Sequence, residues 1–160
     1  MPQIDEHLKW CLKDPKRLVK TKPDLHLAQK HVKKSEYNYG VVQTLERLKI
    51  YDWAFNVGFY AIYHCFLAIL AKHGYESRNQ ACTITVLLTL INEKKLDLDK
   101  DLVTQFDTLD VEKSISSPTV RESREISTYG VETSIDLQQL KKIKELILKV
   151  QRETIRILGE

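Results

Sequence analysis

A stretch of 19 residues without Asp, Glu, Lys or Arg, from Trp53 to Ala71, constrains the fold of this chain more than any other feature. It is long enough to cross a bilayer as a helix. It also contains polar side chains, namely Asn56, Tyr60, Tyr63 and His64, and basic residues flank it on both sides rather than on one. We therefore expect a helix that is apolar on nearly all sides and lies at the centre of a soluble helical core.

The segments around this stretch carry helix-start signals. Asp24 after Pro23 predicts the N-cap of a helix over about 24–49, and Asp52 predicts that of the central helix, which ends near Gly74. Ser77 and Gln80 have the spacing of a capping box, in which the Gln is the third helical residue, and they predict a helix over about 78–93.

Weaker patterns complete the set of expected elements. Apolar spacing predicts a short N-terminal helix and helices over 99–111, from Pro118 to Gly130, and from Asp136 to the end, with a loop over 114–118. Only five Gly and four Pro argue against a strand-rich fold with many turns. We expect an all-α antiparallel bundle of four to five long helices with short accessory helices. The 160 residues favour a single domain over 1–160, with an accessory helix and basic linker over 1–22 and the bundle over 24–160.

Charge is unevenly distributed along the chain. The net charge is +3, of which residues 1–34 contribute +5, whereas 92–136 contribute −5 and 137–160 contribute +3. The basic run from Lys9 to Lys34 is either a solvated face or a track for phosphates, and Lys dominates it with only Trp10 interleaved.

The cysteines and the N-terminus indicate a reducing compartment. Cys11, Cys65 and Cys82 are odd in number and far apart, so we expect free thiols and neither a disulfide framework nor a zinc site. The acidic start lacks the apolar region of an export signal, which favours a cytoplasmic protein. His26 and His31 lie about 140° apart on a helix and cannot share a metal. The isolated glycines exclude a phosphate loop. From the histidine spacing and the glycines together, we expect no metal and no cofactor.

Two stretches resemble the prokaryotic HEPN family, in the branch associated with toxin–antitoxin systems. One runs through 52–91 and includes FYAIYH, LAILAK and GYESRN; the other is REISTYG over 124–130, which is similar to the R-x4-Y signature of that family. The similarity follows the helix order over the whole chain and is strongest over 52–91.

The resemblance implies a helical bundle that commonly dimerises around a cleft directed at RNA or nucleotides. Many members are toxins encoded beside a small nucleotidyltransferase antitoxin. Members that cut RNA use an Arg, a polar residue and a nearby His, with the His as acid or base towards the ribose 2′-hydroxyl. In this chain Arg78 and Asn79 match the basic and polar pair, but Gln80 stands at the position of the His. An amide has no titratable proton near neutral pH, so the family mechanism lacks its central group.

The cleft residues that the resemblance implies also have simpler interpretations, and both stay open. Gln80 serves either as a capping residue or as an RNA contact, and Arg124 either as a phosphate contact or as an ion-pair partner of Glu122 or of the acidic segment. Aromatic residues at helical spacing are core residues or a cleft wall. The full set of predicted cleft residues is Arg124, Tyr129, Arg78, Asn79, Gln80, Tyr60, Tyr63 and His64.

Three functional hypotheses follow. The first is a non-catalytic module that binds RNA, a nucleotide or a partner protein, which the loss of the His favours. The second is an active, metal-independent ribonuclease toxin neutralised by a nucleotidyltransferase antitoxin, with His64 as the one histidine able to replace the missing group. The third is an unrelated helical bundle with similar packing. The surplus of apolar helix surface predicts a homodimer, and no membrane association is expected.

Overall fold

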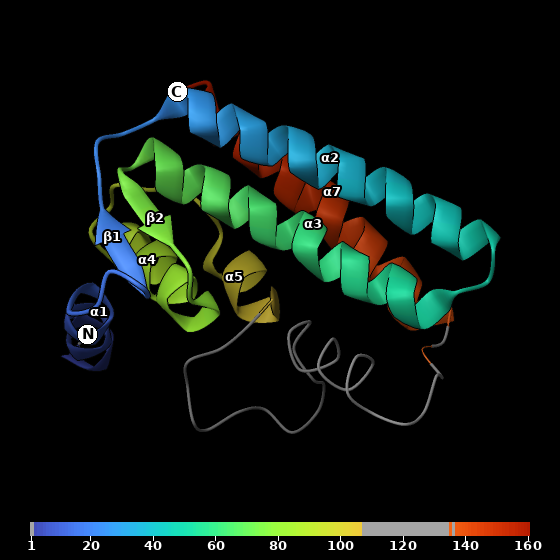
Figure 1. Cartoon of the computed structure of the whole chain (residues 1–160), viewed down its shortest axis with the longest axis horizontal. Helices are drawn as coiled ribbons and strands as arrows, with labels where there is room; N and C mark the ends of the chain where they lie inside the picture. Colours follow the sequence, from blue (N-terminus) through green and yellow to red (C-terminus); the bar gives the residue numbers. More distant parts are fainter. Residues whose placement is uncertain (1, 107–134, 136) are drawn as a thin grey trace.

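The computed structural model describes residues 2–106, 135 and 137–160, and it has an all-α architecture, as the sequence predicts. A minor two-stranded sheet accompanies the helices of the described residues (Figure 1). The helices are α1 (Pro2–Leu12), α2 (Leu25–Arg47), α3 (Tyr51–Lys72), α4 (Gln80–Asn92), α5 (Lys100–Phe106) and α7 (Leu137–Leu158). The strands are β1 (Leu18–Lys20) and β2 (Tyr75–Ser77).

Three long helices, α2, α3 and α7, form the bundle (Figure 1). α2 and α3 are an antiparallel pair, and α7 packs along both, with its apolar stripe buried against them. α3 is the most buried of the three, as its uncharged sequence predicts. At the crossing of α3 and α7, a Cβ on Gly58 would lie only 3.1 Å from Cδ1 of Ile143, so the small residue permits a close approach.

α3 passes the length and composition test for a membrane span, but two thirds of its most apolar window are buried inside the protein. That burial is typical of the core helix of a soluble protein.

Of the two predicted ends of α3, only the C-terminal one agrees with the structure. Its C-terminus is confirmed, because Gly74 follows the helix with a φ of 83°.

The predicted cap at Asp52 is wrong. The helix begins at Tyr51 after Ile50, so Asp52 lies inside the first turn. The reason is the tight α2–α3 connection, where Ile50 N–H donates to the Leu45 carbonyl and Lys49 takes a φ of 61°.

The predicted capping box at the start of α4 is also wrong. Asn79, in extended conformation, is the N-cap, and its side-chain oxygen accepts from Cys82 N–H at 3.0 Å. Gln80 is the first helical residue, whereas Ser77 ends β2. The pairing of β1 with β2 holds Ser77 extended and moves the helix start two residues along the chain.

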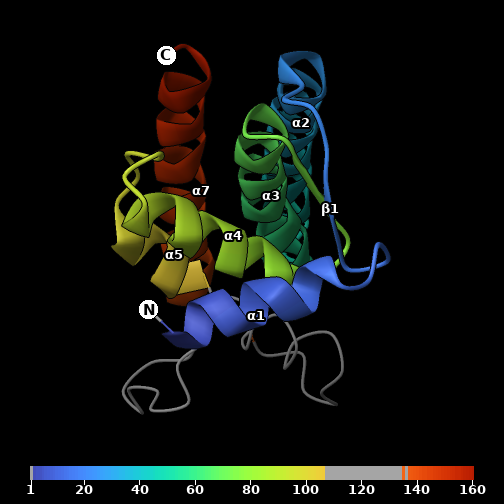
Figure 2. The ribbon, with the colours of Figure 1, turned by 90° about the vertical axis from the view of Figure 1, so that its left-hand side faces the viewer.

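The remaining elements form a smaller layer at one end of the bundle, where α1 lies across α4 and the strands connect them to α2 and α3 (Figure 2). β1 and β2 are antiparallel, with Leu18 opposite Ser77 and Lys20 opposite Tyr75. The sequence predicts no strand here, because three residues are too few to show an alternating pattern. Part of the predicted helix over 99–111 is confirmed as α5. The rest of that helix, the loop over 114–118 and the helix from Pro118 to Gly130 lie outside the described residues.

The expectation of three free thiols is corrected. Cys11 in α1 and Cys82 in the first turn of α4 form a disulfide across 71 residues of sequence, and Cys65 is a buried free thiol. Sequence spacing does not reveal this pair, because only the packing of α1 on α4 brings the two residues together.

Candidate functional site

A shallow cavity of about 230 Å³ lies where the first half of α2, the second half of α3 and strand β2 meet. Its walls combine apolar side chains from the two helices with polar side chains from β2 and the residue after it. The lining residues are Leu27, His31, Leu67, Ala71, Tyr75, Glu76, Ser77 and Arg78. The cavity thus offers both apolar contacts and polar groups to a small group of atoms.

Two histidines meet across the α2–α3 interface beside this cavity. Nδ1 of His31 lies 2.9 Å from Nδ1 of His64, and the rings are tilted with centroids 5.2 Å apart. One ring therefore donates its Nδ1 proton to the other, which requires different tautomers in the two neutral side chains. His31 lines the cavity, and His64 contacts His31 but does not itself line the cavity.

The environment keeps both imidazoles neutral near pH 7. Burial, then the neighbouring His31, then Lys34 lower the pKa of His64 to about 4. Burial also lowers the pKa of His31, while Glu76 partly opposes that shift. Glu76 thus favours the charged form of His31, whereas no carboxylate favours that of His64 among the causes of its shift.

Arg78 supplies the positive charge of the site. Its backbone N–H donates to the Arg17 carbonyl at 2.9 Å, which extends the strand pairing and fixes the residue at the cavity rim. Its guanidinium is exposed, and within the described residues it makes no ion pair or side-chain hydrogen bond. The five N–H donors of this side chain are therefore available to a ligand.

The structure separates the other predicted cleft residues from this cavity. Asn79 uses its side-chain oxygen as the cap of α4, and Gln80 is half-buried in the first turn outside the lining. Tyr63 stacks on Phe59 and Phe106, and its hydroxyl lies 3.1 Å from Oγ1 of Thr83. The structure thus places Tyr63 against the core aromatics and outside the lining of the cavity.

Tyr60 lies on the exposed side of α3, 36% accessible, with its ring edge on Phe59. It shares a face with His64, one turn along the helix, but does not line the cavity. Arg124 and Tyr129 lie outside the described residues. Of the eight predicted residues, two thus belong to the candidate site: Arg78 at the rim of the cavity and His64 in contact with His31.

His31, Glu76 and Ser77 are the residues that sequence reasoning missed as site members. The spacing argument pairs His31 only with His26, which lies on the same helix. A helical hairpin with its turn near residue 50 places the first half of α2 beside the second half of α3, and that signal pairs His31 with the region of His64. No comparable signal marks Glu76, because the strand pairing that orients it is short.

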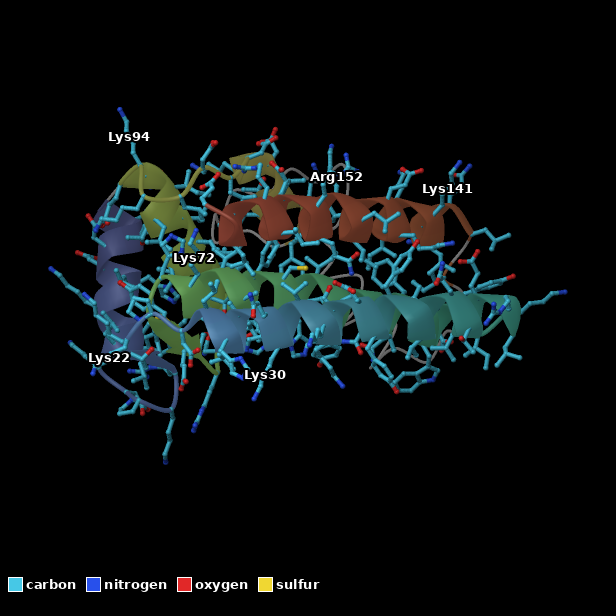
Figure 3. The ribbon with its side chains drawn as sticks, turned by 90° about the horizontal axis from the view of Figure 1, so that it is seen from above. Lys22, Lys30, Lys72, Lys94, Lys141 and Arg152 are labelled. Atoms are coloured by element: carbon cyan, nitrogen blue, oxygen red, sulfur yellow. A yellow bond between two sulfur atoms is a disulfide. The ribbon has the colours of Figure 1, made fainter. Side chains whose placement is uncertain are left out.

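Exposed lysines continue the positive charge outward from the site along α2, where Lys30, Lys33 and Lys34 are exposed. Lys30 and Lys22 extend from the α2 edge of the molecule, opposite Arg152 of α7 (Figure 3). Lys72 is different, because its ammonium donates to the carbonyls of Ile157 and Glu160 at the end of α7. The lining also contains the Glu76 carboxylate, which opposes an anion. The Arg78 guanidinium, the neutral imidazoles, the Ser77 hydroxyl and the nearby ammonium groups are the groups that suit an anionic ligand such as a phosphate.

No protein-family model matches this chain, and no curated protein matches it.

Proposed function

We propose that this protein is a HEPN-like module that binds RNA or a nucleotide, without cleaving RNA, as part of a toxin–antitoxin type of system in the cytoplasm. The observation that carries the proposal is that Arg78, whose guanidinium has no side-chain partner among the described residues, lines one cavity together with His31. In this arrangement a phosphate accepts hydrogen bonds from Arg78, and His31 offers a further contact.

The size of the cavity supports a small ligand group. Its volume of about 230 Å³ is below the ~300–1,000 Å³ of sites that enclose a drug-sized molecule. It therefore suits one phosphate or one base, with the rest of the ligand on the surface. The exposed lysines of α2 extend the positive charge over that surface, which suits the backbone of a single strand.

The chemistry supports binding over cleavage. Gln80 is an amide in the first turn of α4 and does not line the cavity. A base with a pKa of about 4, as at His64, is a weak proton acceptor for a ribose hydroxyl at neutral pH.

An active metal-independent ribonuclease is the second candidate, and the His31–His64 pair favours it. In that mechanism His31 takes the proton of the 2′-hydroxyl, His64 positions the His31 ring, and Arg78 neutralises the phosphate. The two candidates differ in one measurable property, which is whether bound RNA is cut.

A homodimer and a nucleotidyltransferase partner belong to the same proposal. Four exposed apolar residues belong to the ends of helices that meet at one end of the bundle: Leu48 and Ile50 in the α2–α3 connection, Trp53 in the first turn of α3 and Leu137 at the start of α7. Such a patch is suited to an interface. Light scattering after size exclusion tests the dimer, and a strictly monomeric mass at tens of micromolar contradicts it.

RNA binding and cleavage are tested together on a labelled mixed-sequence single strand without metal. We expect wild type to bind and Arg78→Ala to bind about 10-fold more weakly, with a salt slope smaller by about 0.7, because one phosphate contact is lost. Arg152→Ala is the matched control, since it removes an exposed arginine from the other side of the bundle. Equal losses in both variants contradict a site at Arg78.

The cleavage arm compares wild type, His64→Ala and Gln80→His. We expect no cutting by wild type. Cutting that disappears in His64→Ala overturns the non-catalytic proposal in favour of the ribonuclease. Cutting by Gln80→His alone shows that the other catalytic groups remain.

A further inference from the structure

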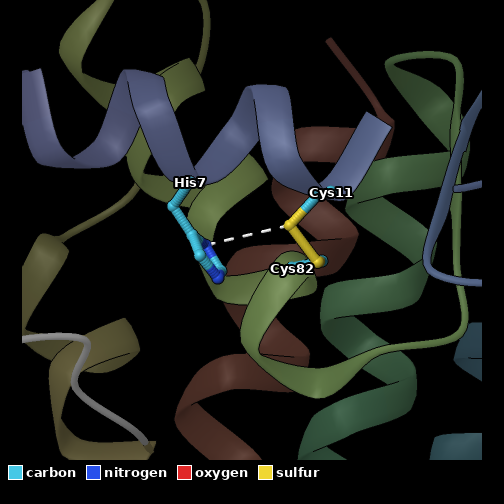
Figure 4. A group of neighbouring side chains, drawn as sticks. All are labelled: His7, Cys11 and Cys82. Atoms are coloured by element: carbon cyan, nitrogen blue, oxygen red, sulfur yellow. Dashed lines mark hydrogen bonds between the residues drawn. A yellow bond between two sulfur atoms is a disulfide. The ribbon is translucent and has the colours of Figure 1, made fainter. Parts of the chain in front are cut away.

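A second cluster of reactive side chains lies away from the cavity, between α1 and α4 (Figure 4). It consists of His7, Cys11 and Cys82, and their ligand atoms all lie within 4.8 Å of one another. His7 and Cys11 are four residues apart and therefore share one face of α1, while Cys82 faces them from the first turn of α4. Both sulfurs are fully buried, and the His7 ring is half-buried.

The separation of His7 from Cys11 is close to that of two ligands of one tetrahedral metal ion, whereas the two sulfurs, 2.05 Å apart in the disulfide, must move apart after reduction. Zinc binds thiolate sulfur at ~2.3 Å and imidazole nitrogen at ~2.0–2.1 Å, which places two ligands of one ion about 3.6 Å apart. Nδ1 of His7 lies 3.8 Å from Sγ of Cys11. A disulfide alone needs no histidine at this distance, so the position of His7 is the feature that points to a ligand.

Neighbouring groups hold the His7 ring in place, and zinc binding at Nδ1 replaces the hydrogen bond that this atom makes with Thr85. Oγ1 of Thr85 lies 2.6 Å from Nδ1, and the Trp10 ring stacks on the imidazole with centroids 5.4 Å apart. Arg17 covers the other part of this surface, with its guanidinium 3.7 Å from the centre of the Trp10 ring. The imidazole is therefore positioned before any ion arrives.

We propose that His7, Cys11 and Cys82 bind a zinc ion when the disulfide is reduced, so that the same place joins α1 to α4 in either redox state. A dithiol reductant transfers two electrons and two protons to the disulfide and is itself oxidised to a disulfide, which breaks the S–S bond and leaves two thiols. Zinc then displaces both thiol protons to solvent and forms two Zn–S bonds and one Zn–N bond. Three protein ligands leave the fourth position for a water molecule.

The third cysteine does not compete for the ion or the reductant. Cys65 is buried between α2 and α3, and burial raises the pKa of its thiol to about 11. A thiol reagent should therefore react with Cys65 only on unfolding.

The test measures zinc binding to the reduced, folded protein by competition with a chromophoric chelator, and uses Co²⁺ as a spectroscopic probe. We expect one ion per chain, with the sulfur-to-cobalt charge-transfer bands and the visible bands of a tetrahedral site. His7→Gln retains the disulfide when oxidised and should bind zinc at least ~100-fold more weakly after reduction, because loss of a ligand exceeds the ~10–100-fold effect of outer partners. His26→Gln, an exposed histidine on α2, is the matched control and should bind as wild type.

If the reduced protein stays folded, either of two results overturns the proposal. One is reduced wild type that binds no zinc while circular dichroism shows that it stays folded. The other is His7→Gln that binds zinc as tightly as His26→Gln does. If reduction itself unfolds the protein, zinc added during refolding of the reduced chain should restore the native spectrum, and failure to do so also contradicts the proposal.

Discussion

The interface of α2 and α3 contains two polar clusters one helical turn apart, and they differ in how completely their hydrogen bonds are made. The sealed cluster consists of Ser35, Cys65 and Gln151. The Ser35 hydroxyl donates to the Ala61 carbonyl at 2.6 Å and accepts from the Gln151 amide at 3.0 Å. All three side chains are buried, so this cluster has no free group to offer a ligand.

The open cluster consists of His31, His64 and Arg78. The two half-buried imidazoles are joined by one hydrogen bond between their Nδ1 atoms. The guanidinium of Arg78 has no side-chain partner in the described part of the chain. The same pair of helices thus carries a polar cluster that specifies packing and another that retains unused donors. Complete pairing indicates a structural role, and unused donors beside a cavity indicate a binding role.

The largest expected effect is on the sealed cluster. Ser35→Val leaves the Gln151 amide buried without its acceptor, so we expect a loss of about 2 kcal/mol in the free energy of unfolding. RNA affinity should not change. Urea denaturation measures the loss, and Thr44→Val, at an exposed position of the same helix, is the control that should cost under about 0.5 kcal/mol. Equal costs for the two variants contradict a structural role for Ser35.

A smaller effect concerns the open cluster and pH. The pKa of His64 in the folded protein, about 4, is below its value of about 6.5 in the unfolded chain, so between these values the unfolded state binds more protons. The free energy of unfolding should therefore fall as the pH decreases from 6.5 to 4. We expect a loss of about 1–2 kcal/mol, less than the full shift gives, because solvent screens a half-buried ring.

Unfolding at several pH values measures this dependence. His64→Gln should weaken it, whereas His26→Gln, with its exposed side chain, should keep it. An unchanged pH dependence in His64→Gln places the responsible group elsewhere.

The smallest expected effect concerns the residues that join the open cluster to α4. Asn79→Ala removes the cap that accepts from Cys82 N–H and should cost about 1 kcal/mol. Gln80→Ala should cost less than about 0.5 kcal/mol, because Gln80 is the first helical residue and not the third member of a capping box. Thermal unfolding measures both losses. A larger loss for Gln80→Ala than for Asn79→Ala would support the capping box that the sequence predicts and contradict Asn79 as the N-cap.

Sequence reasoning recovers the elements that depend on local pattern. The uncharged stretch after Trp53 identifies the central helix, and Asp24 marks the start of α2, where its side chain accepts from Leu27 N–H. The same reasoning fails where distant segments decide the outcome. The pairing of β1 with β2 moves the α4 cap from Ser77 to Asn79, and the packing of α1 on α4 joins two cysteines that spacing leaves unrelated.

The candidate site shows the same division. Arg78 and His64 are recognisable by residue type; the structure places Arg78 in the lining of the cavity and His64 against His31, outside the lining. Their connection depends on His31, which belongs to another helix and has no local signature. A site assembled from two helices and a strand becomes visible only when the register of the helical hairpin is known.

The most direct test of the open cluster as the binding site is an NMR titration of the histidine rings with and without single-stranded RNA. Each ring is assigned with single His→Gln variants. A phosphate beside Arg78 and His31 favours the imidazolium form, so we predict that RNA raises the pKa of His31 and, by a smaller amount, that of His64. The ring resonances of His73, which does not line the cavity, should not shift when RNA is added. RNA that binds while the pKa values of His31 and His64 stay unchanged contradicts the account.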